Sequence, residues 1–125
     1  MILSFSMRIG IVGSRKFQSP ESVKSFVKSL PKDSVIISGG CQGPDSWAED
    51  TARNTGFKVA IFLPDLPPNG APRYLFTKAF YARNRLIAEN SDIIHAFVSH
   101  NRKGGTEYTI KYALKIGVPV IIHTN

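Results

Sequence analysis

The segment "SVIISGGCQGPDSWAEDTARNTGFKVAIFL", residues 34–63, contains two apolar strand-like runs joined by one helix-like run. Residues 34–39 and 58–63 are continuous apolar runs rich in β-branched residues, which is typical of strands covered on both faces. Between them, small and apolar residues recur at helical spacing from Pro44 to Thr55, and Gly56 ends the pattern. The segment therefore predicts a parallel β-α-β unit.

The same alternation continues on both sides of this unit. Further strand-like runs cover residues 7–13, 92–98 and 118–123, and further helices are predicted to begin at Pro20 and to cover about 75–89 and 106–116. The order β-α-β-α-β-α-β-α-β predicts one α/β domain, residues 7–125, with a Rossmann-like three-layer fold. We expect a five-stranded parallel sheet with helices on both faces. Residues 1–6 are expected to form an N-terminal extension.

Length and composition limit the class of protein. The chain has 125 residues, of which 42% are apolar, and this suits one globular domain. No apolar run approaches the roughly 20 residues of a membrane helix, and the first ten residues lack the pattern of a signal peptide. We therefore expect a cytoplasmic protein without membrane contact.

The sequence contains no recognisable metal site. Cys41 is the single cysteine, which excludes an internal disulfide and a multi-cysteine zinc site, and we interpret it as a small residue in a tight turn. His95, His100 and His123 lie on or beside strands without the spacing of metal ligands, so we interpret them as core or edge residues. We expect neither a metal nor a cofactor.

The net charge favours an anionic partner. Sixteen Lys and Arg stand against nine Asp and Glu, a net charge of +7. A nucleotide, a nucleic acid or a phosphosugar would fit this charge. Because the basic residues form no continuous run, solubility alone is the alternative explanation.

Three glycine-rich loops follow predicted strands, and the carboxyl ends of parallel strands meet at one edge of the sheet. Glycine allows close approach of a phosphate to the backbone, and a following helix supplies free N–H groups and partial positive charge. Neither a P-loop motif nor G-x-G-x-x-G is present. We expect a nucleotide or phosphate pocket formed by Gly13, Ser14, Arg15, Gly39, Gly40, Gly43, Gly104, Gly105 and Thr106.

Charged residues on the predicted helices add to this site. At 100° per residue, Arg83 lies in the middle of an apolar stripe, so it should meet a ligand phosphate or a carboxylate such as Glu89 or Asp92. Asp45 begins the second helix, where it serves either the helix dipole or a ribose or base.

Three further features leave alternatives open or concern the surface. The connection 64–74, with four prolines, is either a lid over the site or an extended surface loop. Glu49 and Arg53 are expected to form an outward i, i+4 pair. Glu107, in the first turn of the last helix, suits the helix dipole without any further role.

Four segments in this order resemble the SLOG superfamily, a Rossmann-like group that includes the DNA-processing protein DprA and the LOG phosphoribohydrolases. They are "IGIVGSRKF", "VIISGGCQGPDSWAEDTARNTG", "ARNRLIAENSDIIHAFV" and "KGGTEYTIKYALKIGVPVII". The likeness is greatest to small stand-alone members of unknown function, and it covers residues 7–123. The resemblance implies a nucleotide-type ligand that also contacts Asp45, Arg83 and Asn84. It further implies a homo-oligomer, for which Tyr108 and Tyr112 would lie on the outer flank of the last helix.

The resemblance leaves the activity open. LOG enzymes hydrolyse the N-glycosidic bond of nucleoside 5'-monophosphates with an arginine, which Arg83 resembles, and a glutamate from P-G-G-x-G-T-x-x-E. Thr109 occupies the position of that glutamate, and Glu107 stands two residues too early. We therefore expect a domain that binds or senses a phosphorylated nucleoside derivative. The alternatives are a LOG-like hydrolase that uses Arg83 and Glu107, and a DprA-like module for single-stranded DNA.

Overall fold

The computed structural model describes residues 6–124, and it confirms the predicted order of strands and helices. Of the predicted N-terminal extension, residues 1–5 lie outside the described range. The elements are β1 (Arg8–Gly13), α1 (Pro20–Lys28), β2 (Val35–Ser38), α2 (Pro44–Thr55), β3 (Lys58–Ile61), α3 (Arg73–Glu89), β4 (Ile93–Val98), α4 (Gly105–Lys115) and β5 (Val120–Thr124).

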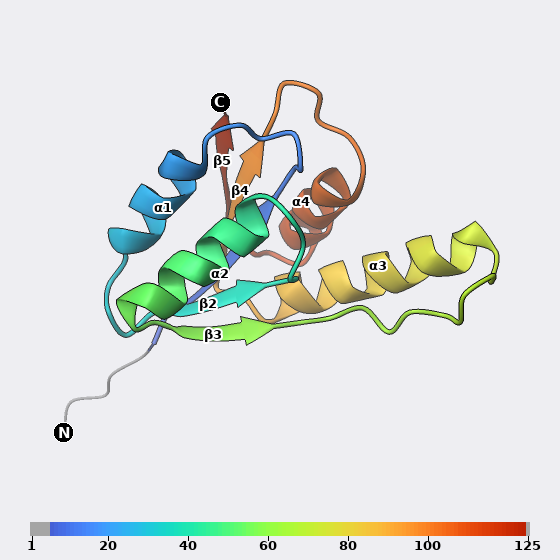
Figure 1. Ribbon diagram of the computed structural model, residues 1–125, viewed down its shortest axis with the longest axis horizontal. Helices are drawn as coiled ribbons and strands as arrows, with labels where there is room; N and C mark the ends of the chain where they lie inside the picture. The colour runs from blue at the N-terminus through green and yellow to red at the C-terminus, as the bar shows by residue number, and fades with distance from the viewer. Residues whose placement is uncertain (1–5, 125) are drawn as a thin grey trace.

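The five strands form one parallel sheet in the order β3-β2-β1-β4-β5, covered by helices on both faces (Figure 1). One apolar core joins α1 and α2 to one face, with Ile11 at its centre. The second core joins α3 and α4 to the other face, around Ile94. This is the predicted three-layer α/β fold. Successive connections leave β1 and β4 in opposite directions, and such a switch point opens a crevice at the carboxyl ends of the two strands.

The helix starts differ in how their backbone N–H groups are satisfied. The hydroxyl of Ser19 accepts a hydrogen bond from the N–H of Ser22, 3.3 Å away, and so caps α1. In contrast, α2 and α4 begin after Gly43 and Gly104, and neither has a side-chain cap. Both glycines have φ near +80° to +90°, a conformation that other residues rarely adopt. The starts of α2 and α4 lie at the same edge of the sheet.

The long connection after β3 does not cover the pocket described below. It runs extended beside the N-terminal half of α3, and together they project beyond the sheet (Figure 1). Leu63, Asp65, Leu66 and Pro67 line a shallow hollow against α3, and no residue of 64–74 lines the pocket described below. The segment is therefore a surface loop in this structure.

Two of the three histidines belong to the body of the domain, as predicted. Nδ1 of His95 lies 2.9 Å from Nε2 of His123 on the neighbouring strand, and the ring of Phe97 stacks on that of His123. Burial, with a contribution from His123, lowers the pKa of His95 to about 4. The His95 ring is therefore neutral at pH 7, which suits a structural role.

Candidate functional site

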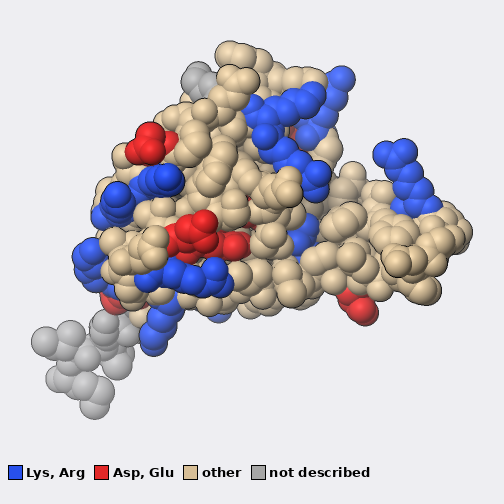
Figure 2. Space-filling view, in the orientation of Figure 1, with Lys and Arg blue, Asp and Glu red and all other residues tan. Residues whose placement is uncertain are grey.

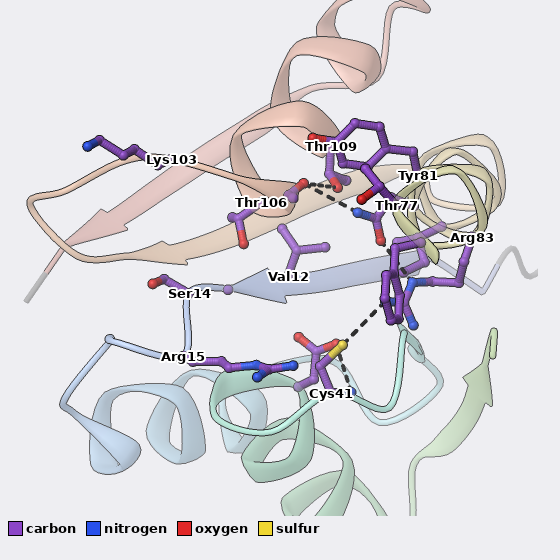
Figure 3. Close-up of a pocket in the computed structure, with 16 residues that line it drawn as sticks. Val12, Ser14, Arg15, Cys41, Thr77, Tyr81, Arg83, Lys103, Thr106 and Thr109 are labelled. Atoms are coloured by element: carbon purple, nitrogen blue, oxygen red, sulfur yellow. Dashed lines mark hydrogen bonds between the residues drawn. The ribbon is translucent and has the colours of Figure 1, made fainter. Parts of the chain in front are cut away.

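A pocket of about 400 Å³ opens at the carboxyl edge of the sheet, between the ends of β1 and β4 (Figure 3). Its walls come from the β1–α1 loop, the β2–α2 loop, one face of α3 and the start of α4. The pocket is lined by Val12, Gly13, Ser14, Arg15, Cys41, Asp45, Thr77, Phe80, Tyr81, Arg83, Asn84, Ile87, Lys103, Gly105, Thr106 and Thr109. The structure thus brings together residues from all three glycine-rich loops.

One wall of the pocket is rich in positive charge and hydrogen-bond donors. It contains Lys103 and the uncapped first turn of α4 with Thr106, and Arg15 reaches into the pocket from the β1–α1 loop. Figure 2 shows basic side chains gathered over the β1–α1 and β4–α4 loops. In Figure 3, Arg15 extends toward Cys41. Ser14 contributes only its hydroxyl, because its backbone N–H donates to the carbonyl of Phe97 at 3.0 Å.

The opposite wall is acidic, which the sequence analysis did not predict. Oδ2 of Asp45 accepts hydrogen bonds from the backbone N–H groups of Gly39 and Cys41, at 3.3 and 3.4 Å. Oε1 of Glu49 accepts from the N–H of Gly40 at 3.0 Å. The protein's own carboxyls therefore already accept from these three N–H groups. The expectation that Gly39 and Gly40 hold a phosphate does not fit this arrangement.

Glu49 also corrects a second expectation. Its side chain is buried beneath the β2–α2 loop, whereas Arg53 is exposed one turn later. The outward pair of Glu49 with Arg53 was therefore wrong. The i, i+4 spacing fits such a pair, but the free N–H of Gly40 at the end of β2 draws the carboxylate inward.

Asp45 combines deep burial with access to the pocket. Its side chain is 5% exposed and lines the pocket. Desolvation by burial raises its pKa to about 7, with a smaller contribution from Glu49. The backbone donors of Cys41 and Gly39 and the charge of Arg83 oppose this rise. The carboxyl is therefore divided between its neutral and ionised forms at neutral pH.

Arg83 lies inside the apolar stripe as predicted, but it satisfies its donors within the protein. Its Nη1 donates to the carbonyl of Gly39 at 2.6 Å and approaches that of Phe62 at 3.5 Å. Nη2 contacts Sγ of Cys41 at 3.3 Å, and Nε donates to Oδ1 of Asn84 at 2.8 Å. The guanidinium thus fastens α3 to the β2–α2 loop. Asn84 in turn donates from Nδ2 to the carbonyl of Gly105, 3.3 Å away.

Among the described residues, neither of the carboxylates expected as partners of Arg83 pairs with it. Asp92 accepts from the N–H of Arg8, and Glu89 accepts from the hydroxyl of Tyr112. Arg83 nonetheless lines the pocket, so its predicted contact with a ligand stays a prediction.

The outer part of the pocket is aromatic. Thr77, Phe80 and Tyr81 lie on the same face of α3 as Asn84, at spacings of three and four residues. The ring of Tyr81 stacks on that of Tyr108, with centroids 4.1 Å apart. A flat, partly exposed aromatic surface therefore adjoins the polar walls.

The two tyrosines expected at an oligomer interface have partners within the chain. Tyr108 stacks on Tyr81 and accepts a hydrogen bond from Arg85 at 2.8 Å, and Tyr112 donates to Glu89 at 3.0 Å. They pack α4 against α3 and lend no support to an oligomer. The homo-oligomer stays a prediction.

The residues considered for catalysis are poorly placed for it. Glu107 does not line the pocket and forms a bidentate pair with Arg102, with distances of 3.0 and 2.9 Å. Thr109 does line the pocket, and its hydroxyl donates to the carbonyl of Gly105 at 2.8 Å. A carboxylate is thus missing from the position where the LOG mechanism needs one.

Gly13 serves packing rather than an unusual backbone conformation. A Cβ at this position would lie 2.5 Å from the ring of Pro44, so only glycine allows α2 to begin this close to β1. Pro44 leads directly into Asp45, and the contact therefore sets the position of the acidic wall.

Several lining residues were not predicted from the sequence. Phe80 was missed because its position fits the apolar core stripe of α3. Thr77, Tyr81 and Asn84 share a helix face with Phe80, and that face lines the pocket. Lys103 directly precedes the glycine-rich loop at Gly104, and this position could have indicated a basic residue of the pocket. Cys41 is more than a turn residue, because its sulfur contacts Arg83 in the pocket wall.

Neither a protein-family model nor a curated protein matches the chain. The chain is similar to a solved structure, the X-ray structure of DNA processing protein A (DprA) from Streptococcus pneumoniae, with a TM-score of 0.73 and 23% sequence identity. The similarity covers 94% of the present chain and 50% of the DprA chain, so the present chain spans half the length of DprA. At this identity the likeness establishes a fold, the Rossmann-like fold of DprA.

Within residues 6–124 no helix is long and apolar enough to cross a bilayer. Nor does the same range contain a group of three or more side chains of the kinds that hold a metal ion.

Proposed function

We propose that this DprA-like fold binds a phosphorylated nucleoside derivative, such as a nucleotide or an ADP-ribose-like ligand, and acts as a binding or sensing domain. The observation that carries the proposal is that cationic side chains, a buried carboxyl and aromatic rings line one pocket. These three environments match the phosphate, the sugar hydroxyls and the base of a nucleotide.

The phosphate is assigned to the cationic wall. The first-turn N–H groups of α4 have no side-chain cap, and they supply donors and partial positive charge. Lys103 adds a full charge from the β4–α4 loop, and Arg15 adds another from the β1–α1 loop. The acidic wall, by contrast, would repel a phosphate, and its carboxyls already accept from the N–H groups of Gly39, Gly40 and Cys41. We assign the base to Phe80 and Tyr81, whose rings offer a stacking surface.

The proposal predicts which charges matter for affinity. In isothermal titration against nucleoside 5'-monophosphates, ADP-ribose and cyclic nucleotides, we expect saturable binding of at least one of them. Replacing both Arg15 and Lys103 by alanine should weaken that binding at least about tenfold, because each removes a charge-assisted contact to the phosphate. Lys58→Ala is the matched control, since this exposed lysine lies at the amino end of β3. Binding that survives the double replacement unchanged would contradict the assignment of the phosphate.

Catalysis of the LOG type is not proposed. The hydroxyl of Thr109 donates to the backbone, and Glu107 is paired with Arg102 outside the pocket. In the described part of the chain, α4 therefore places no carboxylate where the LOG mechanism needs one. Release of free base from a panel of nucleotides, abolished in Glu107→Gln, would support the hydrolase instead.

Single-stranded DNA is the second candidate ligand. It is favoured by the fold shared with a DNA processing protein, by the net charge of +7 and by the basic side chains around the pocket (Figure 2). A nonspecific charge effect loses affinity steeply with salt. Oligonucleotide binding that persists at about 200 mM salt would support this candidate, and binding that disappears there would leave only a charge effect.

A further inference from the structure

One acceptor in the pocket wall is left without a donor. Oδ2 of Asp45 accepts from the N–H groups of Gly39 and Cys41, but Oδ1 accepts no hydrogen bond from any residue in the described part of the chain. The residue is 5% exposed, and it lines the pocket. Among the described residues the enclosed side-chain atoms without a partner are the hydroxyls of Ser34, Ser38 and Ser99, so Oδ1 of Asp45 is open to the pocket, where a ligand can bring a donor to it.

The position of Asp45 within the pocket restricts which part of a nucleotide it meets. Asp45 and Arg83 hold the two sides of the same peptide segment, since Gly39 donates to Asp45 and accepts from Arg83. Asp45 and Arg83 therefore lie at the same depth in the pocket, on either side of Gly39. Phe80 precedes Arg83 by three residues, which places the aromatic surface about one helical turn, roughly 5 Å, farther out. The cationic wall lies on the other side of the pocket.

This order of environments corresponds to the order of groups in a nucleotide. The ribose lies between the phosphate and the base, and it is the group that carries two adjacent hydroxyl donors. A carboxylate is a suitable acceptor for such a diol, as in other sheet-edge nucleotide sites. An amino group of the base is the competing donor, but the base is assigned one turn farther out.

We propose that Asp45 accepts hydrogen bonds from the 2'- and 3'-hydroxyls of the ligand, so that the pocket selects ribonucleotides over their deoxy counterparts. The proposal rests on the proposed function and adds to it the class of sugar. Because a site that hydrogen-bonds a hydroxyl discriminates strongly against an analogue without it, we expect a preference of at least about tenfold.

The protonation of Asp45 gives a second, independent signature. The groups that face this carboxyl are Glu49 on its own helix, Arg83 on α3, Cys41 in the β2–α2 loop and Arg15 from the β1–α1 loop. Burial raises the pKa of Asp45 to about 7. A diol donates more strongly to the ionised form, whose fraction rises from about one tenth at pH 6 to about nine tenths at pH 8 for such a pKa. The affinity for a ribonucleotide should therefore rise by up to about tenfold over this range.

A titration with matched nucleotides tests the inference. The 5'-monophosphates of adenosine, guanosine, cytidine and uridine are titrated at pH 6, 7 and 8, followed by the 2',3'-dideoxy counterpart of the tightest binder. The dideoxy compound keeps the same phosphate and base, so the ratio of the two affinities isolates the diol. We expect the ribonucleotide to bind at least about tenfold tighter at pH 8, with a ratio that shrinks toward pH 6. In Asp45→Asn the ratio should be small at every pH, whereas Asp50→Asn, at an exposed position of the same helix, should leave it unchanged.

The outcomes separate this inference from the proposed function. Equal affinity for the ribo and dideoxy compounds would overturn the role of Asp45 and leave nucleotide binding in place. A preference among bases that is lost in Asp45→Asn, without any preference among sugars, would show that Asp45 contacts the base and would also overturn the inference. If none of the four monophosphates binds, the proposed function and this inference fall together.

Discussion

Replacing Arg83 by methionine is expected to lower the free energy of unfolding by about 3 kcal/mol, because the change removes charge-assisted hydrogen bonds in a buried place. Methionine fills a similar volume but leaves the carbonyl of Gly39 without its donor at 2.6 Å. It also releases Asn84 and Cys41, which Arg83 contacts at 2.8 and 3.3 Å. For a domain of this size the loss corresponds to a fall of roughly 10 °C in the melting temperature, measurable by calorimetry.

The matched control for Arg83 is Arg85→Met, two residues later on the same helix. Arg85 donates to the hydroxyl of Tyr108 at 2.8 Å, at the partly exposed side of α3. We expect this change to cost about 1 kcal/mol or less. Replacing a buried charge by an apolar side chain is sometimes neutral. A methionine variant at position 83 as stable as the unchanged protein would show that the burial of the guanidinium costs as much as its hydrogen bonds contribute.

Asp45→Asn is expected to stabilise the protein at high pH. The pKa of Asp45 rises from 3.8 to about 7 on folding, so the folded state keeps a proton that the unfolded state has lost between these values. Stability contributed by this group is therefore full below about pH 4 and is lost as the pH rises to about 7. The loss reaches about 2–4 kcal/mol above pH 7. Asparagine carries no charge, so it avoids this loss, while its Oδ1 can still accept from Gly39 and Cys41.

The measurement is urea unfolding of Asp45→Asn and the unchanged protein at pH 5 and pH 8. The gain in stability should be small at pH 5 and about 2 kcal/mol or more at pH 8. The His95 and His123 pair acts in the opposite direction, since its lowered pKa values reduce stability as the pH falls below about 6.5. Both variants share that pair, so it cancels in the difference. With Asp50→Asn as control, an equal or reduced stability of Asp45→Asn at pH 8 would contradict the buried carboxyl described here.

A stabilising change at position 45 would also fit a functional role. Proteins keep destabilising groups where binding or catalysis needs them. The expected gain in stability and the expected loss of sugar selectivity in the same variant therefore belong together.

Much of the fold could be predicted from the sequence because parallel strands and amphipathic helices leave strong local patterns. The apolar runs located all five strands, and Pro20, Pro44 and Gly56 marked helix ends close to their positions in the structure. The period of the third helix also placed Arg83 on a buried face, which its 5% exposure confirms.

The polarity of the pocket could not be predicted in the same way. Glu49 and Arg53 fit a surface ion pair by spacing, and only the three-dimensional position of Gly40 shows why Glu49 turns inward. Arg83 was expected to meet a carboxylate or a phosphate, but it donates to backbone carbonyls. The direction in which a carbonyl points cannot be predicted from residue types. The acidic wall was therefore missed, although Asp45 was recognised as a candidate ligand residue.

The most direct test of a phosphate on the cationic wall is a nuclear magnetic resonance titration of the ¹⁵N-labelled protein with nucleoside 5'-monophosphates. The proposed binding mode predicts the largest saturable shifts for the backbone amides of Arg15, Gly105 and Thr106. The amides of Gly39 and Gly40, already bonded to Asp45 and Glu49, should respond less. Largest shifts at Gly39 and Gly40 would contradict the placement of the phosphate, and no saturable shift with any nucleotide would contradict nucleotide binding itself.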